Sequence, residues 1–194
     1  MNIAIRMIAV MLVGVPAMAA TAAETAAVDR DIKQEQRIEQ GLQSGALNTR
    51  EAARLEQQQA HVEQMEARAA RDGNVSSQEA ARIQEAQNRT SLAIRKDKHN
   101  AQLGNPNSAS SQRMQADAQR DINQQTRIRN GLADGSLTVR ESSRLEHQQA
   151  HGDRQLARAG ADGHVGKQEQ QRVAYNEARQ SNHIWRQRHD AQTK

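Results

Sequence analysis

The chain has 194 residues and a formal net charge of +4, with 26% charged residues, 1% aromatic residues and no cysteine. Because there is no cysteine, disulfides, thiolate nucleophiles and metal–thiolate sites are excluded. The core must be thin and aliphatic, since the aromatic side chains that dominate most cores are nearly absent. The positive charge is not gathered into a dense stripe with interleaved aromatics, so we do not expect nucleic acid as a partner.

Residues 1–19 have the pattern of a secretory signal peptide. Arg6 supplies the positive start, residues 7–15 are apolar, and Ala17-Met18-Ala19 gives a small-x-small cleavage pattern. The apolar stretch falls short of the roughly 18 residues that a transmembrane helix needs. We therefore predict export to the periplasm, with a mature chain that begins near Ala20.

An internal duplication organises the rest of the chain. Residues 30–102 align without a gap onto residues 120–192, at an offset of 90, with 34 identities in 73 positions. The predicted domains are helical repeat 1 (28–102), a flexible linker (103–117) and helical repeat 2 (118–194). Because the linker is rich in Pro, Gly, Asn and Ser, we expect it to let the two halves move semi-independently.

Each repeat is predicted to form three helices joined by two short turns, so the fold class is all-α, with two tandem copies of a three-helix unit. In each turn a glycine ends one helix, an apolar residue follows, and a capping residue then starts the next helix. The turn glycines are Gly45, Gly73, Gly135 and Gly163. A glutamate three residues after the cap completes a capping box, except that Gly166 has no side chain with which to cap.

These turns are EF-hand-like in spacing, because a glutamate follows each glycine by six residues. If Gly73 is the sixth residue of such a loop, Glu79 is the twelfth. The first and third positions then fall on Arg68 and Ala70, which carry no carboxylate. The other three turns fail in the same way, so we do not expect calcium to bind in these turns.

Polar residues interrupt the apolar stripes of the helices. Leu55 and Val62 recur at helical spacing with Gln58 between them, and repeat 2 has Gly152 in the same stripe. Two interpretations remain open, namely a groove that faces a partner and a shallow bundle whose interior is partly wet. Glu63, Glu66 and Glu85 are expected to lie on a solvated helix face beside arginines.

Three histidines of repeat 2 are candidate metal ligands. His147 and His151 are four residues apart on a predicted helix, and a helical hairpin about Gly163 would bring His183 to a similar level. Repeat 1 lacks two of these three histidines. Zinc, copper or nickel are the cofactors that such a site would take, and the alternative is a set of exposed histidines. No nucleophile–base pair or phosphate loop is recognisable, so we do not expect an enzyme.

A basic segment near the C-terminus is a candidate surface-binding site. It contains Arg179, Trp185, Arg186 and Arg188 without an acidic residue between them. Such a segment is suited to peripheral contact with an anionic surface, either lipid headgroups or an acidic protein.

The repeated Gly-x-apolar-x-x-x-Glu turns and the Lys98-His99-Asn100 ending resemble a group of uncharacterised exported helical proteins of Gram-negative bacteria. In character the chain is also loosely similar to periplasmic proteins of the Spy and CpxP type, although it lacks their Leu-Thr-x-x-Gln motif. The resemblance implies an all-α fold and a periplasmic location.

The sequence therefore predicts a non-catalytic periplasmic binding module. Its partners would be envelope proteins or a second copy of the chain, in a protein-interaction or chaperone-like role during envelope stress. The alternative is a periplasmic protein for divalent transition metals or metal stress that uses the histidines of repeat 2.

Overall fold

The computed structural model describes residues 15–190, with side chains from Ala20 onward. Within that range the secondary structure is helical, with no strand. The helices are α1 (Val15–Ser44), α2 (Thr49–Ala69), the short 3₁₀ helix η1 (Ala70–Asp72), α3 (Ser77–Lys98), α4 (Ala109–Ala133), α5 (Val139–Ala159) and α6 (Lys167–Arg188). Most of the predicted signal peptide, residues 1–14, lies outside the described residues, and residues 15–19 form the start of α1. No helix in the described part of the chain is long and apolar enough to cross a membrane.

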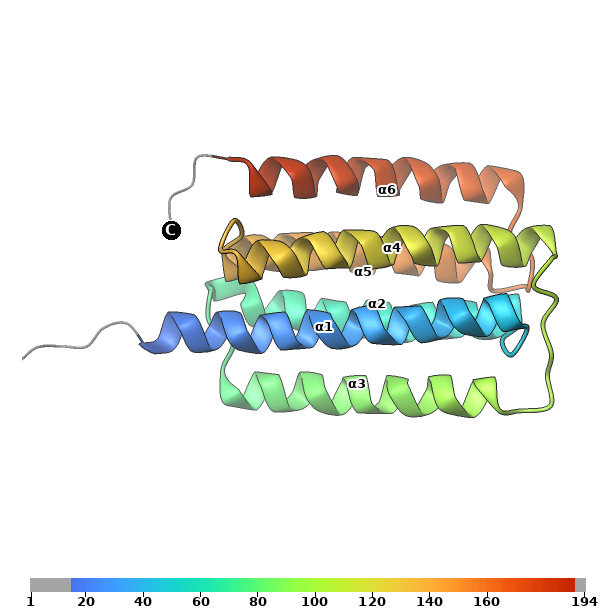
Figure 1. Ribbon diagram of the computed structural model, residues 1–194, viewed down its shortest axis with the longest axis horizontal. Coiled ribbons are helices and arrows are strands. Elements are labelled where there is room, and N and C mark those ends of the chain that lie inside the picture. Colours follow the sequence, from blue (N-terminus) through green and yellow to red (C-terminus); the bar gives the residue numbers. More distant parts are fainter. Residues whose placement is uncertain (1–14, 191–194) are drawn as a thin grey trace, which may run out of the picture.

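The two repeats form one bundle (Figure 1). The most extensive contacts join α2 to α5 and α1 to α4, so the first two helices of one repeat pack on their counterparts in the other. The paired helices α1 and α4 run in opposite directions, and α3 and α6 lie on opposite outer sides of the central four. This matched arrangement is what an approximate two-fold axis between the repeats produces.

The segment between the repeats makes a backbone contact with the first turn of the bundle. Gly104 N donates to Gly45 O at 2.8 Å. A Cβ at Gly104 would lie only 2.3 Å from Leu47 O, so this close approach requires glycine. Residues 109–117 are already helical, because Ser108 caps α4 by accepting a hydrogen bond from Ser111 N.

Local capping accounts for where the other helices begin. Asn48, Ser76 and Thr138 each form a capping box with the glutamate three residues later. Gly166 makes no side-chain cap, as expected, although its N–H still donates to Glu169 Oε2 at 2.8 Å. The four turn glycines have φ between 72° and 90°, the left-handed conformation predicted for them.

Two aliphatic clusters hold the ends of the bundle together, and both contain residues of both repeats. The first includes Ile38, Leu55, Met114 and Leu156, together with other aliphatic side chains such as Leu42, Leu47 and Ile94. The larger side chains of the second cluster include Val28, Ile128, Leu132, Leu145 and Ile184. The space between the two clusters is filled by polar side chains.

Candidate metal centre

Carboxylates fill the middle of the four central helices. On α1 they lie between Val28 and Ile38, and on α4 between Met114 and Ile128, so an apolar cluster closes the bundle on either side of them. The carboxylate core, as we call this set, consists of Asp31 and Glu35 on α1, Glu56, Glu63 and Glu66 on α2, Asp121 on α4, and Glu146 and Asp153 on α5. All except the partly exposed Asp121 are at most 4% exposed.

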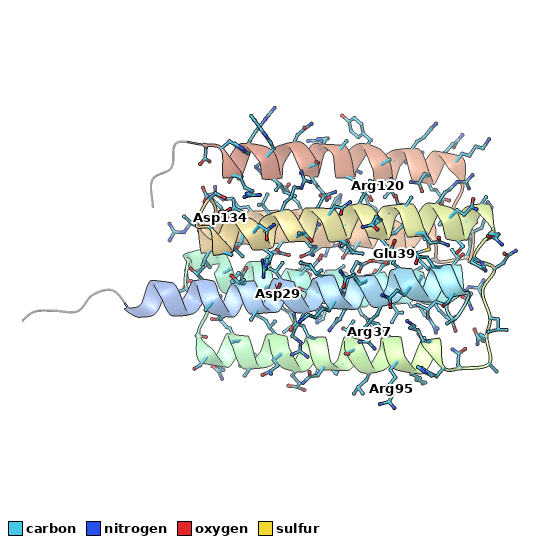
Figure 2. All side chains as sticks on the ribbon, viewed as in Figure 1. Asp29, Arg37, Glu39, Arg95, Arg120 and Asp134 are labelled. Carbon is cyan, nitrogen blue, oxygen red and sulfur yellow. The ribbon has the colours of Figure 1, made fainter. Side chains whose placement is uncertain are left out.

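The carboxylate core has no basic partner. Among the described residues, no Lys, Arg or His nitrogen lies within ion-pair distance of any of its members. Arg120 lies between α4 and α6 (Figure 2) and pairs with Asp117 and Glu177 beside the core. A buried carboxylate without a counter-charge costs several kcal/mol, so these groups require either a proton or a cation.

Several carboxylate oxygens accept no hydrogen bond. Both oxygens of Glu146 are buried and unpartnered, although its side chain is fully buried. One oxygen each of Asp31, Glu66 and Asp153 is in the same state. Buried polar atoms normally find a partner, so these free lone pairs are what an absent ligand would leave.

Three carboxylates from three helices converge most closely. Glu63, Asp121 and Asp153 each offer an oxygen, and these oxygens lie within 4.8 Å of one another. In the described part of the chain this is the only set of three or more ligand-type residues with that property. Oxygens at this spacing can share one metal ion, because metal–oxygen distances of about 2.3–2.6 Å are typical of Ca²⁺.

Side-chain amides hold the outer oxygens of the core in place. Gln125 donates to Glu63, and Gln149 donates to Asp121. Gln87 reaches in from α3, and its Nε2 lies 2.9 Å from Asp31 Oδ1 and 3.0 Å from Glu66 Oε1. These amides orient the carboxylates without neutralising them, as the hydrogen-bond partners of metal ligands do.

The environment shifts the proton affinity of the core upward. Burial raises the pKa of Glu35 to about 8, and the nearby charge of Asp153 adds to the effect. Burial likewise raises the pKa of Asp31 to about 6. The pKa values of Glu63 and Asp153 lie well above their ordinary ones, first because of burial and then because of neighbouring carboxylates. Without a cation, the core therefore keeps protons that an exposed carboxylate would lose.

The expectation of a solvated acidic face was wrong for two of its three residues. Glu63 and Glu66 are 1% and 0% exposed, and they face acids of the other helices. Glu85 does lie on the surface, where it pairs with Arg89 at 2.5 Å. The helices α1, α4 and α5 cover this face of α2, which cannot be seen from the pattern of α2 alone.

The duplication did carry a signal for this site. At the offset of 90, Asp31 matches Asp121, Glu56 matches Glu146, and Glu63 matches Asp153. Acids at three matched, non-turn positions in both copies are therefore the signal in the sequence from which a shared acidic interior could have been predicted.

The predicted histidine ligands line one surface cavity of about 510 Å³ between α5 and α6. His147, His151 and His183 all contribute to it, together with Arg179 and Arg186. Their ring nitrogens do not form a set within 4.8 Å, unlike the oxygens of the carboxylate core. His183 Nδ1 is 2.9 Å from Gln148 Oε1, and His151 Nε2 is 2.9 Å from Gln155 Nε2. One ring nitrogen of each of these two histidines therefore has a side-chain amide as its hydrogen-bond partner. The structure thus brings the three residues to one cavity but not to coordination distance.

The predicted surface-binding residues all lie on α6. Trp185 is 59% exposed and stacks on His189 with ring centroids 4.6 Å apart. Arg188 forms an ion pair with Asp134 at 2.8 Å and donates a hydrogen bond to Ser136 Oγ at 3.0 Å. Its guanidinium group therefore binds other residues of the same chain. Arg179 and Arg186 remain exposed on the rim of the histidine cavity.

Comparison with known proteins gives no relative: no family model, no curated protein and no solved structure matches the chain.

Proposed function

We propose that this protein binds a divalent metal ion inside the four-helix bundle, through the carboxylate core. The observation that carries the proposal is a set of carboxylates from four helices, all buried except the partly exposed Asp121, that has no basic partner. The unpartnered oxygens of Glu146 support it independently, because they are buried acceptors without a donor. A divalent cation would supply the missing positive charge and the missing contacts together.

The donor set favours a hard cation. Every candidate ligand in the core is a carboxylate or amide oxygen, and neither histidine nor sulfur is among them. Oxygen ligands suit Ca²⁺, Mg²⁺ and Mn²⁺, whereas imidazole and thiolate suit zinc, copper and nickel. Ca²⁺ and Mn²⁺ fit best, because Mg²⁺ usually keeps several waters and this interior is closed by aliphatic clusters at both ends. The site differs from the histidine site expected from sequence in both ligands and metal.

Thermal unfolding of the metal-free protein tests the proposal. Ca²⁺ or Mn²⁺ at 100 times its dissociation constant should stabilise the protein by about 2.7 kcal/mol, which corresponds to a rise in melting temperature of about 5–10 °C. The Asp153→Asn variant should lose most of that rise, because it removes a carboxylate of the closest set. Glu85→Gln is the matched control, because it removes a surface charge on α3 and leaves the core unchanged.

Two results would count against a cation in the core. One is an unchanged melting temperature with every divalent ion. The other is a response to zinc or nickel that disappears in the double variant His147→Ala, His151→Ala, which would instead support the histidine cavity.

We propose that the protein acts in the periplasm, as its N-terminal sequence predicts. We also propose that its fold consists of two copies of one three-helix unit with EF-hand-like turns. Both copies contribute helices to the same interior, and both keep acids at matched positions. The turns themselves bind no cation in this proposal. Asp72 Oδ1 and Asp162 Oδ1 instead accept backbone hydrogen bonds from the residues two positions later.

A second function, contact with an envelope protein, is favoured by one observation on α6. The chain has a single Tyr and a single Trp, and both are exposed on this helix, at 65% and 59%. Aromatic residues beside arginine are typical of the residues that contribute most to protein–protein binding. Arg179 lies 6.0 Å above the Tyr175 ring.

Suppression of aggregation of an unfolding client protein tests this second function. The double variant Tyr175→Ala, Trp185→Ala should lose the suppression, whereas Leu103→Ala, which removes an apolar side chain that is 82% exposed outside α6, should keep it. Equal suppression by the native protein and both variants would exclude α6 as the contact surface. Binding that is lost steeply with added salt would instead indicate an anionic surface.

A further inference from the structure

We infer that the carboxylate core holds two cations, one on each side of the Glu63–Asp153 pair. This inference rests on the proposed function and adds the number and arrangement of the ions. It follows from the way in which the duplication places the carboxylates.

The approximate two-fold axis between the repeats passes close to Glu63 and Asp153. These residues occupy matched positions in the repeats, and their carboxylates belong to the same close set. An element that lies on a two-fold axis is shared by the two halves. Any ligand arrangement on one side of this pair is therefore repeated on the other side, as far as the residues match.

The first side is built around Asp121, and we call it the Asp121 site. The oxygen of Asp121 lies within 4.8 Å of both shared carboxylates. Glu35 and Glu56 also lie on this side, since the negative charge of Glu35 acts on both Glu56 and Asp121. Two carboxylates of the bundle thus support the three that already converge.

The second side is built around Asp31, the counterpart of Asp121, and we call it the Asp31 site. Asp31 and Glu66 lie close together, since both accept a hydrogen bond from the same Gln87 nitrogen, at 2.9 and 3.0 Å. Glu146, the counterpart of Glu56, supplies two buried oxygens without a donor. Its nearest charges include Asp31 and Glu24.

The two sides are not identical, which predicts unequal affinities. The Asp121 site has Glu35 where the Asp31 site has Gln125, and the Asp31 site has Glu66 where the Asp121 site has Leu156. Only the Asp121 site has three oxygens within 4.8 Å of one another among the described residues. The Asp121 site should therefore fill first, and the Asp31 site should contract as the second ion binds.

Native mass spectrometry of the metal-free protein titrated with Mn²⁺ tests the inference. We expect a species with one ion at low Mn²⁺ and a species with two ions at saturation. Asp121→Asn and Asp31→Asn should each stop at one ion, with the affinity of the altered site reduced more than roughly tenfold, because a direct ligand matters at least as much as its outer-shell partners. Glu85→Gln should keep both ions. Circular dichroism establishes that each variant is folded.

The number of ions separates the two claims. Two ions in the native protein, with one left in each variant, support the inference. A single ion that is lost in Asp121→Asn and kept in Asp31→Asn overturns the inference and leaves the proposed function standing. No bound ion overturns both. Two ions that both remain in the two variants place the sites outside the core.

Discussion

At the scale of single residues, the molecule is defined by acids in places where acids are costly. Glu146 is fully buried, its oxygens have no donor, and its pKa is raised first by burial and then by the charges of Glu24 and Asp31. Carboxylates with a structural role usually bind a backbone N–H at a helix N-terminus, an arginine side chain or a water molecule. Glu51 and Glu141 show the ordinary case, since each accepts a backbone hydrogen bond in a capping box.

Substitution of Glu146 separates folding from binding. Glu146→Gln removes an ionisable carboxyl and keeps the shape of the side chain. Because burial disfavours the charged form that pH 8 promotes, the metal-free protein at this pH should gain about 1–3 kcal/mol in free energy of unfolding. The stabilisation by Ca²⁺ or Mn²⁺ should fall in the same variant. Urea denaturation with and without the ion measures both effects. A variant that loses stability without metal would show that Glu146 has a structural partner.

The metal-free protein should become less stable as pH rises. Burial raises the pKa of Glu24 to about 7 from its ordinary value of 4.5, against the smaller opposing effect of the hydrogen bond from Ser142 Oγ. A carboxyl with a raised pKa stabilises the fold fully below about pH 4.5, and this contribution is lost as pH rises to about 7. For Glu24 the loss is about 3 kcal/mol, since a tenfold change in a dissociation constant corresponds to about 1.4 kcal/mol. Asp31, Glu66 and Glu146 lie around it and act in the same direction.

Melting temperatures in chelator at pH 5 and pH 8 measure this dependence. We expect the value at pH 5 to be higher, and the difference to shrink in Glu24→Gln. With Ca²⁺ or Mn²⁺ present, the difference should also shrink, because binding releases the retained protons. A metal-free protein that is more stable at pH 8 than at pH 5 would contradict the account of the core.

At the scale of secondary structure, most of the molecule was predictable. The turns follow from residues that are neighbours in sequence, namely a glycine, a capping residue and a glutamate, so the six helices were expected. The burial of Glu63 could not be predicted from the sequence, because it depends on which helix covers which face of α2. The start of α4 at Ala109 was not predicted either, because the Ser-rich sequence there suggested a linker. Ser108 is nevertheless a good helix cap.

The contact between α5 and α2 provides a test at this scale. Gly160 ends α5, and a Cβ there would lie 2.9 Å from Ala53 Cβ and 3.2 Å from Met114 Sδ. Gly160→Ala should therefore destabilise the protein by about 1–3 kcal/mol through overpacking. Gly152→Ala is the control, because its nearest neighbour is the end of the flexible Gln180 side chain at 3.0 Å. Equal stability of the two variants in urea denaturation would contradict the tight approach of α5 to α2.

At the scale of the whole molecule, the duplication and the buried interior are linked. Either repeat alone would expose its buried acids and its part of each aliphatic cluster, and together the repeats enclose both. The sequence showed the duplication plainly but not the pairing of α1 with α4 and of α2 with α5. That pairing depends on contacts between residues far apart in the sequence, such as Arg129 with Asp29 and Ser143 with Ala67, which are 100 and 76 positions apart. Local patterns carry no information about contacts over such a distance.

The most direct test of a cation in the core is anomalous X-ray diffraction from crystals of the protein grown with Mn²⁺. The account predicts an anomalous peak within coordination distance of Glu63, Asp121 and Asp153, with a second, weaker peak toward Asp31 and Glu146. A peak only at the cavity of His147, His151 and His183, or an interior without any peak at saturating Mn²⁺, would contradict it.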